Sequence, residues 1–239
     1  MFFPVCAPQA ISLARSSQAG TLSRTTIGLG ATDQIMRILW LRNKNQRTLL
    51  TMYDNFKSFL KYFIAFDEAE LDKITECFKP KSVKKNTILL SQGEVCNKFY
   101  YVQSGCIRVG FITKEGDEKT RYVMCDPSIG TALTSFISQK PSFEFIDALE
   151  DTELLVISHE DFYKLNNENA HWKMFYQRIL EMAYSFQNKK IESLVTLSAK
   201  QRYELVLKET PVLVQRLSNK ILASYIDVSQ ETLSRLKSK

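Results

Sequence analysis

The stretch "LASYIDVSQETLSRLKSK" (residues 222–239) places small, apolar and charged residues at spacings typical of two short helices joined by a tight turn. Two helices that cross steeply need a small residue where they touch, and Ala223 supplies it. Asp227 falls at the turn, where a positive φ is tolerated by Asp better than by most residues. Ser229 is expected to cap the second helix, with Glu231 near its positive end. The apolar residues spaced to face inward are Leu222, Ile226, Val228, Leu233 and Leu236.

The outward face of the second predicted helix carries Gln230, Glu231, Ser234 and Arg235. Arginine can bind guanine O6 and N7 in bidentate fashion, glutamate can accept from cytosine N4, and serine can bond several base edges. The structural alternative is an exposed Glu–Arg pair at i, i+4, worth a few tenths of a kcal/mol. Because the whole helix-turn-helix pattern is present, these four residues are predicted to read DNA bases. The predicted phosphate contacts are Lys220, Ser229, Lys237 and Lys239.

Charge is distributed unevenly along the 239 residues, whose net charge is +6. Residues 194–239 hold eight basic and four acidic side chains, whereas residues 52–193 hold 18 basic and 21 acidic ones. A basic C-terminal segment behind an acidic body is consistent with a nucleic-acid surface at one end, and equally with a solvated face. No run of about 18 apolar residues occurs, so no membrane span is expected.

The long helix expected over residues 170–193 carries large apolar residues in steps of three and four, which are typical of a coiled-coil seam. These residues are predicted to form a homodimer contact, although a single amphipathic helix on its own sheet would show the same pattern. The seam residues are Trp172, Phe175, Ile179, Met182 and Phe186. A further helix is expected over residues 198–209, ended by Pro211, and residues 209–219 could add a short strand.

Between Pro80 and Ser158 the pattern changes to short strands rich in β-branched and aromatic residues. Turn signals at 92–93, 104–105, 114–117, 126–127 and 150–151 separate them. Close spacing of this kind predicts an antiparallel sandwich or barrel. Ahead of it, helices are expected from Met52 and after Asp67.

Residues 1–51 show no lasting period and are rich in Ser, Thr, Gly and Arg. They are interpreted as a disordered tail or a mis-assigned start ahead of Met52, with a transit peptide as the alternative. The predicted domains are therefore an extension (1–51), a β-roll (52–169), a dimerisation helix (170–193) and a helix-turn-helix domain (194–239).

The C-terminal phrase resembles the recognition segment of the Crp/Fnr transcriptional regulators, and the order of elements over residues 52–239 is similar to theirs. "GEVCNKFYYVQSGCIRVGF" (93–111) resembles the family's strand-turn-strand motif, with Gly93, Val102, Gly105 and Val109 in place. The resemblance implies an α+β protein: an antiparallel, jelly-roll-like β-roll of the cyclic-nucleotide-binding type, a long dimerisation helix and a winged-helix-like helix-turn-helix domain. It also implies a cytoplasmic homodimer on a palindromic DNA site with a TTGA-like half-site core, and RNA polymerase as a further partner.

The expected effector pocket departs from the cyclic-AMP-binding members. Thr131 and Ala132 stand where those members have an acidic residue, and Ser142 and Phe143 lie near the place of their phosphate-binding arginine. A buried phosphate without a positive partner is costly, and Lys140, the nearby cation, is expected to face solvent. Cyclic AMP is therefore not expected, and the pocket is predicted to hold an apolar or acidic effector, or to be vestigial. Its residues are Gly130, Thr131, Ala132, Leu133, Ser142 and Phe143.

Metal and redox chemistry have little support in the sequence. The five cysteines form no C-x-x-C pair and are predicted to be free thiols of a reducing compartment. His159 and His171 are expected to have surface or capping roles rather than to bind haem, and no metal or cofactor is predicted. No hydrolase, P-loop or dinucleotide motif occurs, so the chain is not expected to be an enzyme. The alternative to a DNA-binding regulator is a sensor or scaffold whose terminal helices contact protein.

Overall fold

The computed structural model describes residues 49–238 and begins with a helix over residues 49–63, followed by α2 (Glu68–Cys77). Asp67 caps α2 through a capping box, in which its side chain accepts from Glu70 N and the Glu70 side chain accepts from Asp67 N. Most of the predicted extension, and Lys239, lie outside the described residues. Residues 49–51 are already helical, so the helix begins ahead of the predicted boundary at Met52.

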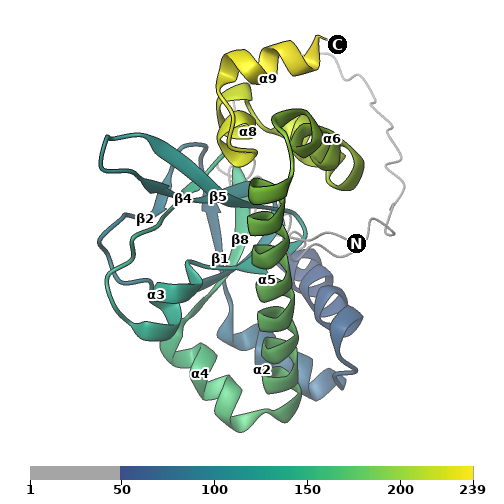
Figure 1. The fold of residues 1–239 in the computed structure, drawn as a ribbon. Coiled ribbons are helices and arrows are strands. Elements are labelled where there is room, and N and C mark those ends of the chain that lie inside the picture. Colours follow the sequence, from purple (N-terminus) through teal and green to yellow (C-terminus); the bar gives the residue numbers. More distant parts are fainter. Residues whose placement is uncertain (1–48, 239) are drawn as a thin grey trace, which may run out of the picture.

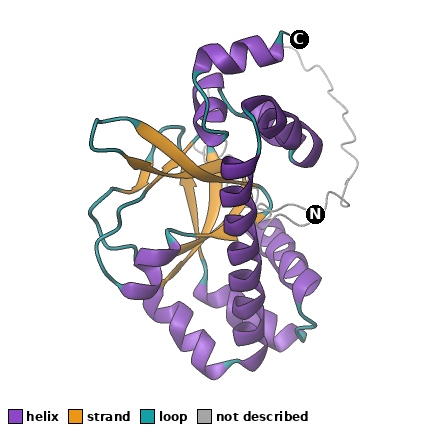
Figure 2. Ribbon diagram, in the orientation of Figure 1, coloured by secondary structure: helices purple, strands orange, loops and turns teal. Residues whose placement is uncertain are grey.

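The strands form two four-stranded antiparallel sheets with the orders β1-β8-β3-β6 and β2-β7-β4-β5 (Figures 1 and 2). The predicted antiparallel β-roll is confirmed. The strands are β1 (Lys79–Val83), β2 (Ile88–Leu90), β3 (Lys98–Ser104), β4 (Cys106–Ile112), β5 (Glu118–Cys125), β6 (Ser128–Gly130), β7 (Phe145–Ala148) and β8 (Thr152–Ser158), with α3 (Leu133–Ser138) between β6 and β7.

Gly105 is required at the turn between β3 and β4. Its φ is +97°, and a Cβ at this position would lie 2.4 Å from Thr152 Oγ1 and 2.8 Å from Asp151 O. The Gly105 N–H also donates to Asp126 Oδ1 at 3.1 Å. The Ser-Gly turn signal therefore reflects both a backbone conformation and a close approach of β8.

After α4 (His159–Glu168), the helix α5 (Ala170–Thr196) runs along the β-roll (Figure 1). Three residues of the predicted dimer seam are buried in the protomer itself: Trp172 is 0% exposed, Phe175 1% and Ile179 4%. Aromatic rings of the N-terminal segment and α4 surround them, including Phe78 and Phe162. The seam prediction is thus wrong for these three residues, because their apolar face is covered by the protomer's own core.

The helical C-terminal region contains α6 (Ala199–Glu209), α7 (Pro211–Arg216), α8 (Asn219–Tyr225) and α9 (Gln230–Lys237). The short strand expected within residues 209–219 is wrong: Pro211 stands in the first turn of α7, where its missing N–H and fixed φ suit a helix start. Within residues 49–238, no β-wing precedes the helix-turn-helix.

The C-terminal helices pack on the sheet that contains β4 and β5. Cys106, Val123 and Cys125 belong to the same buried cluster as Tyr203 of α6 and Leu222 of α8. Cys106 and Cys125 are direct partners in the β4–β5 register, with Cα atoms 4.1 Å apart, and form a disulfide. The prediction of free thiols is therefore wrong for this pair, while Cys77 and Cys96 are free.

Candidate functional site: a recognition helix and an effector cavity

The helix-turn-helix is built as its sequence predicts. Ala223 is 1% exposed, and Leu222 and Leu233, two of the residues predicted to face inward, are 0% exposed. Asp227 adopts φ +53° at the turn, and the Val228 N–H donates to Ala223 O at 3.0 Å, which closes the turn. Ser229 caps α9 by accepting from Thr232 N at 3.2 Å.

Arg202 of α6 holds the turn in place, a role that the sequence does not indicate. Its Nε donates to Ile226 O at 2.8 Å, and its NH2 group donates to Asp227 O at 3.0 Å. These charge-assisted bonds satisfy carbonyls at the end of α8 that have no helical partner. A residue of α6 therefore holds the turn that joins α8 to α9.

All four predicted base-reading residues are exposed on α9: Gln230, Glu231, Ser234 and Arg235. The pKa of the Glu231 carboxyl is lowered, first by its hydrogen bond to the backbone N–H of the same residue and then by Ser229. The face therefore presents both a carboxylate and a guanidinium to solvent at neutral pH. It lies at the end of the molecule beyond α5 (Figure 1).

The predicted phosphate-contacting residues surround this face. Lys220 is exposed at the start of α8, and Lys237 is exposed while donating to Asn219 Oδ1 at 2.6 Å. Ser229 is exposed and serves as the N-cap of α9, whereas Lys239 lies outside the described residues.

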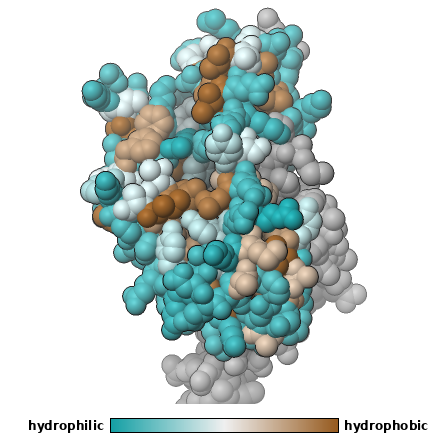
Figure 3. All heavy atoms as spheres, turned by 60° about the horizontal axis from the view of Figure 1, so that its bottom comes forward, coloured by the Kyte–Doolittle hydropathy of each residue, from teal (hydrophilic) through white to brown (hydrophobic). Residues whose placement is uncertain are grey.

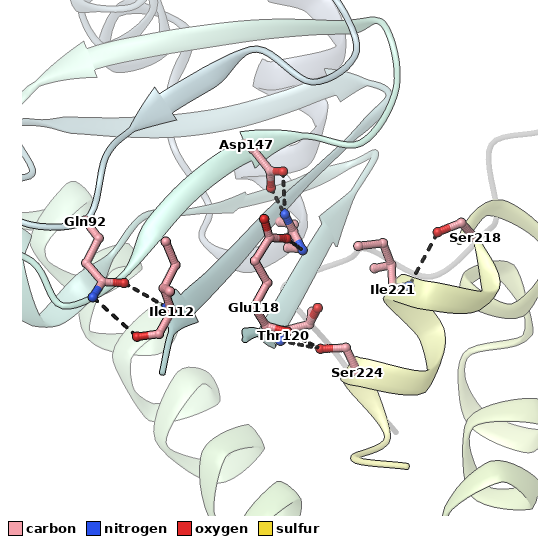
Figure 4. Close-up of polar contacts among 9 residues, drawn as sticks. Gln92, Ile112, Glu118, Thr120, Asp147, Ser218, Ile221 and Ser224 are labelled. Atoms are coloured by element: carbon pink, nitrogen blue, oxygen red, sulfur yellow. Dashed lines mark hydrogen bonds and ion pairs between the residues drawn. The ribbon is translucent and has the colours of Figure 1, made fainter. Parts of the chain in front are cut away.

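Helix α8, the first helix of the helix-turn-helix, is docked on the sheet that contains β5, as Figure 4 shows. Ser224 Oγ of α8 accepts from Thr120 N of β5 at 2.7 Å. The Arg216 NH1 group lies 2.7 Å from Asp126 Oδ1, and its NH2 group donates to Glu150. The C-terminal helices and the β-roll are therefore joined by polar contacts between residues 66 to 104 positions apart.

Lys190, near the C-terminal end of α5, lies at this junction. Its ammonium group donates to the carbonyls of Thr120 and Arg121 and lies 4.2 Å from the ring centroid of Tyr225 in α8. Burial, together with repulsion from Arg121, lowers the pKa of Lys190 to about 7. This side chain of α5 thus contacts both strand β5 and helix α8.

A cavity of about 320 Å³ lies between the β-roll and α5. Of the predicted pocket residues, Gly130, Thr131 and Leu133 line it. Ala132 and Ser142 are buried elsewhere and Phe143 is half exposed, so the prediction is wrong for these three. The helix α5 contributes the opposite wall, which includes Met182 and Phe186 of the predicted seam. The apolar part of the wall also contains Phe99, Met124, Ile129, Ile179, Leu180 and Ala183.

Two charged residues that the sequence reading missed also line the cavity. Arg121 of β5 donates to Glu144 Oε1 at 2.8 Å, and the Glu144 side chain is only 2% exposed. Burial raises the pKa of Glu144, and Arg121 opposes that effect. Lys140, expected to be the nearby cation, is exposed and is absent from the cavity wall. A charged residue in the middle of the strand "EKTRYVMC" was the available signal for Arg121.

Neither histidine caps a helix, because Ser158 caps α4 and Asn169 caps α5; both histidines are half-buried and contact other side chains. His171 Nδ1 lies 2.8 Å from Glu70 Oε2, and the His159 ring packs on Phe136 and Tyr163. No group of three or more His, Cys, Asp or Glu side chains in the described part of the chain could hold a metal ion. No helix among the described residues has the length and apolar character needed to cross a membrane.

Comparison with known proteins bears on the β-roll and its surroundings. Residues 80–169 match the family model "Cyclic nucleotide-binding domain". The anaerobic regulatory protein of Bacillus subtilis is 29% identical over 97 residues, 40% of this chain and 41% of that protein. The chain thus aligns with about two fifths of this curated relative.

Solved structures show a similar fold over a larger share of the chain. A structure described as a transcriptional regulator of the Crp/Fnr family from Eubacterium rectale is 23% identical with a TM-score of 0.58, covering 72% of this chain and 82% of that one. The c-di-GMP-responsive global regulator CLP of Xanthomonas campestris is 18% identical with a TM-score of 0.56, covering 72% and 90%. The resemblance to Crp/Fnr regulators is confirmed at the level of the fold.

Proposed function

We propose that the chain is a sequence-specific DNA-binding transcription regulator of the Crp/Fnr type that acts as a cytoplasmic homodimer and senses an effector through its β-roll. The observation that carries this proposal is the exposed set Gln230, Glu231, Ser234 and Arg235 on a helix fixed by a buried core, a capped start and the Arg202 brace. The matched relatives are regulators, and the function proposed here is non-enzymatic.

In the proposed complex α9 enters the major groove. Arg235 donates to guanine, Glu231 accepts from cytosine, and Gln230 and Ser234 contact neighbouring edges. Lys220 and Lys237 lie where phosphates would pass and supply affinity without sequence information. Two such heads read a palindromic site with half-sites about one helical turn apart.

We place the dimer contact on a face of α5 different from the predicted seam. Seven exposed residues follow one another in steps of three and four, which is a coiled-coil repeat along the solvent side of the helix. Its apolar members include Tyr184, 71% exposed, and Val195, 79% exposed, and Asn188 lies among them as a polar register position. Figure 3 shows apolar side chains in separate patches on a mostly hydrophilic face of the molecule. The repeat is Met174, Gln177, Glu181, Tyr184, Asn188, Ile191 and Val195.

Effector sensing would act through the cavity, because its walls belong to the β-roll and to the helix that carries the dimer contact. A ligand that binds one conformation of these walls more tightly than another shifts the population toward that conformation. The arrangement of the two helix-turn-helix domains in the dimer would change with it. We also propose RNA polymerase as a further partner of the DNA-bound dimer. The usual cyclic-AMP contacts are lacking, so we propose that cyclic AMP is not the effector.

Selection of bound DNA from a random pool, with wild-type protein and with Arg235→Ala, tests the proposal. We expect a palindromic motif from the wild type and loss of one symmetric base pair from the motif in the variant. If the wild type enriches no motif at low salt, with or without a bacterial metabolite extract, the terminal helices are not a DNA reader. Lys164→Ala serves as the control, since this exposed lysine lies on α4 and not on the helix-turn-helix.

A further inference from the structure

The polar part of the effector cavity is an ion pair that is already complete. Glu144 is 2% exposed and its carboxylate bonds Arg121 at 2.8 Å, while the remaining wall is mainly apolar. Among the described residues that line the cavity, Arg121 is the one cation and Glu144 the one anion. A ligand therefore meets a wall with no net charge and with its strongest donor already engaged.

We propose that this cavity binds an uncharged, largely apolar molecule, and that the Arg121–Glu144 pair excludes anions from it. The inference rests on the proposed effector role of the cavity and names the class of ligand. Of the two effector classes that the sequence leaves open, we therefore favour an apolar effector and reject an acidic one.

The exclusion follows from the surroundings of Glu144. An anionic group that approached Arg121 would lie beside the buried Glu144 carboxylate, or would take away its only ionic partner in the described structure. Like charges at short range, and a buried carboxylate without its cation, are both unfavourable. A cationic group would compete with Arg121 for Glu144.

The rest of the cavity wall is suited to a ligand with an aromatic or alkyl skeleton. Phe99, Tyr122 and Phe186 offer rings, and Met124 and Met182 offer flexible side chains that adapt to an irregular shape. The Tyr122 hydroxyl is engaged with Thr131 O, so it does not compete for the ligand. The side chain of Gln187 lines the cavity and can bond one uncharged polar atom of the ligand.

Two fluorescent probes that differ by one sulfonate give a direct test on the full chain: N-phenyl-1-naphthylamine, which is uncharged near neutral pH, and 1-anilinonaphthalene-8-sulfonate. We expect the uncharged probe to bind at one site per chain at least tenfold more tightly than the sulfonate. Thr134→Trp, at an exposed position on the cavity wall, should weaken the uncharged probe at least tenfold by filling the space. Ala183→Phe on the opposite wall is a second filling variant, in case the first perturbs α3.

The specificity of the effect is tested with Glu144→Gln, which removes the anion and leaves Arg121 unopposed. The preference should shift toward the sulfonate by at least tenfold. Glu150→Gln is the matched control, because it breaks a Glu–Arg pair outside the cavity, and the preference should then stay as in the wild type.

The proposal is overturned if the sulfonate binds the wild type as tightly as the uncharged probe and both probes lose their binding in the cavity-filling variants. It is also overturned if filling leaves the uncharged probe's affinity unchanged, since the probe then binds elsewhere. Failure of the DNA selection would refute the regulator function and leave these probe results unaffected, so the two failures are distinguishable.

Discussion

Replacing Arg121 with methionine removes the cation that pairs directly with Glu144 in the cavity wall while keeping a side chain of similar length. Glu144 is 2% exposed and stays buried after the change, whereas the Arg121 side chain itself is 30% exposed. Breaking a buried pair by deleting one partner costs about 3–5 kcal/mol, and partial exposure of Arg121 places this case at the lower end. We expect Arg121→Met to lower the free energy of unfolding by about 3 kcal/mol near neutral pH.

The pH dependence gives this loss a signature. Burial already raises the pKa of Glu144 in the folded chain, and losing Arg121 raises it further. A carboxyl with a raised folded pKa favours folding below its unfolded pKa, and that contribution is lost as the pH rises through the folded value. The deficit of Arg121→Met should therefore be largest near neutral pH and shrink as the pH falls toward 4.5, the ordinary pKa of a glutamate carboxyl.

Urea unfolding at several pH values measures both effects. The double variant Arg121→Met/Glu144→Gln should recover most of the lost stability, because no buried charge remains. A deficit that is the same at acidic and neutral pH, or a double variant as unstable as the single one, would refute the reasoning that Glu144 is a buried carboxylate held by Arg121.

Three further predictions follow from other contacts. Because the pKa of Lys190 is lowered to about 7, wild-type stability should rise with pH between about 7 and 9 relative to Lys190→Met, by at most about 1.4 kcal/mol per unit; parallel pH curves in urea unfolding would contradict this. Ile191→Glu, on the exposed repeat of α5, should shift the chain from dimer to monomer in sedimentation, with Lys189→Gln, which changes the net charge by the same one unit, as the control; an unchanged dimer would move the contact elsewhere. Cyclic AMP should not displace the uncharged probe in competition titrations, and displacement at micromolar concentration would refute the assignment of the cavity.

The helix-turn-helix could be predicted in detail because its determinants are local. Ala223, Asp227 and Ser229 act within a few residues of one another, and the inward and outward faces follow from helical spacing. The β-roll could be predicted because turn residues separate its strands, with Gly105 required by both φ and the nearness of β8.

The errors arise where a pattern has two physical interpretations. Steps of three and four occur on two faces of α5, and only the structure shows that Trp172 and Phe175 face the protomer's own aromatic core. Pro211 stops α6, yet the same fixed φ starts α7 directly afterwards.

The missed residues depend on contacts between distant segments. Arg121 of β5 is hydrogen-bonded to Glu144, which directly precedes β7. Ser224 of α8 is hydrogen-bonded to Thr120, although the two residues are 104 positions apart in the sequence. Strand alternation alone places Arg121 on a surface without saying what lies opposite. The cavity's charge pair and the docking of the reading head could therefore not be predicted from local spacing.

The most direct test of the central claim is a base-pair substitution scan of the selected DNA site by equilibrium binding, at one stated salt concentration. We compare wild type, Arg235→Ala and Lys220→Ala. The account predicts that Arg235→Ala loses about 1–3 kcal/mol of discrimination at one base pair in each half-site, whereas Lys220→Ala weakens binding to all sequences alike and lowers the salt dependence. If Arg235→Ala instead weakens every sequence equally and keeps the discrimination profile of the wild type, α9 does not read bases and the account is contradicted.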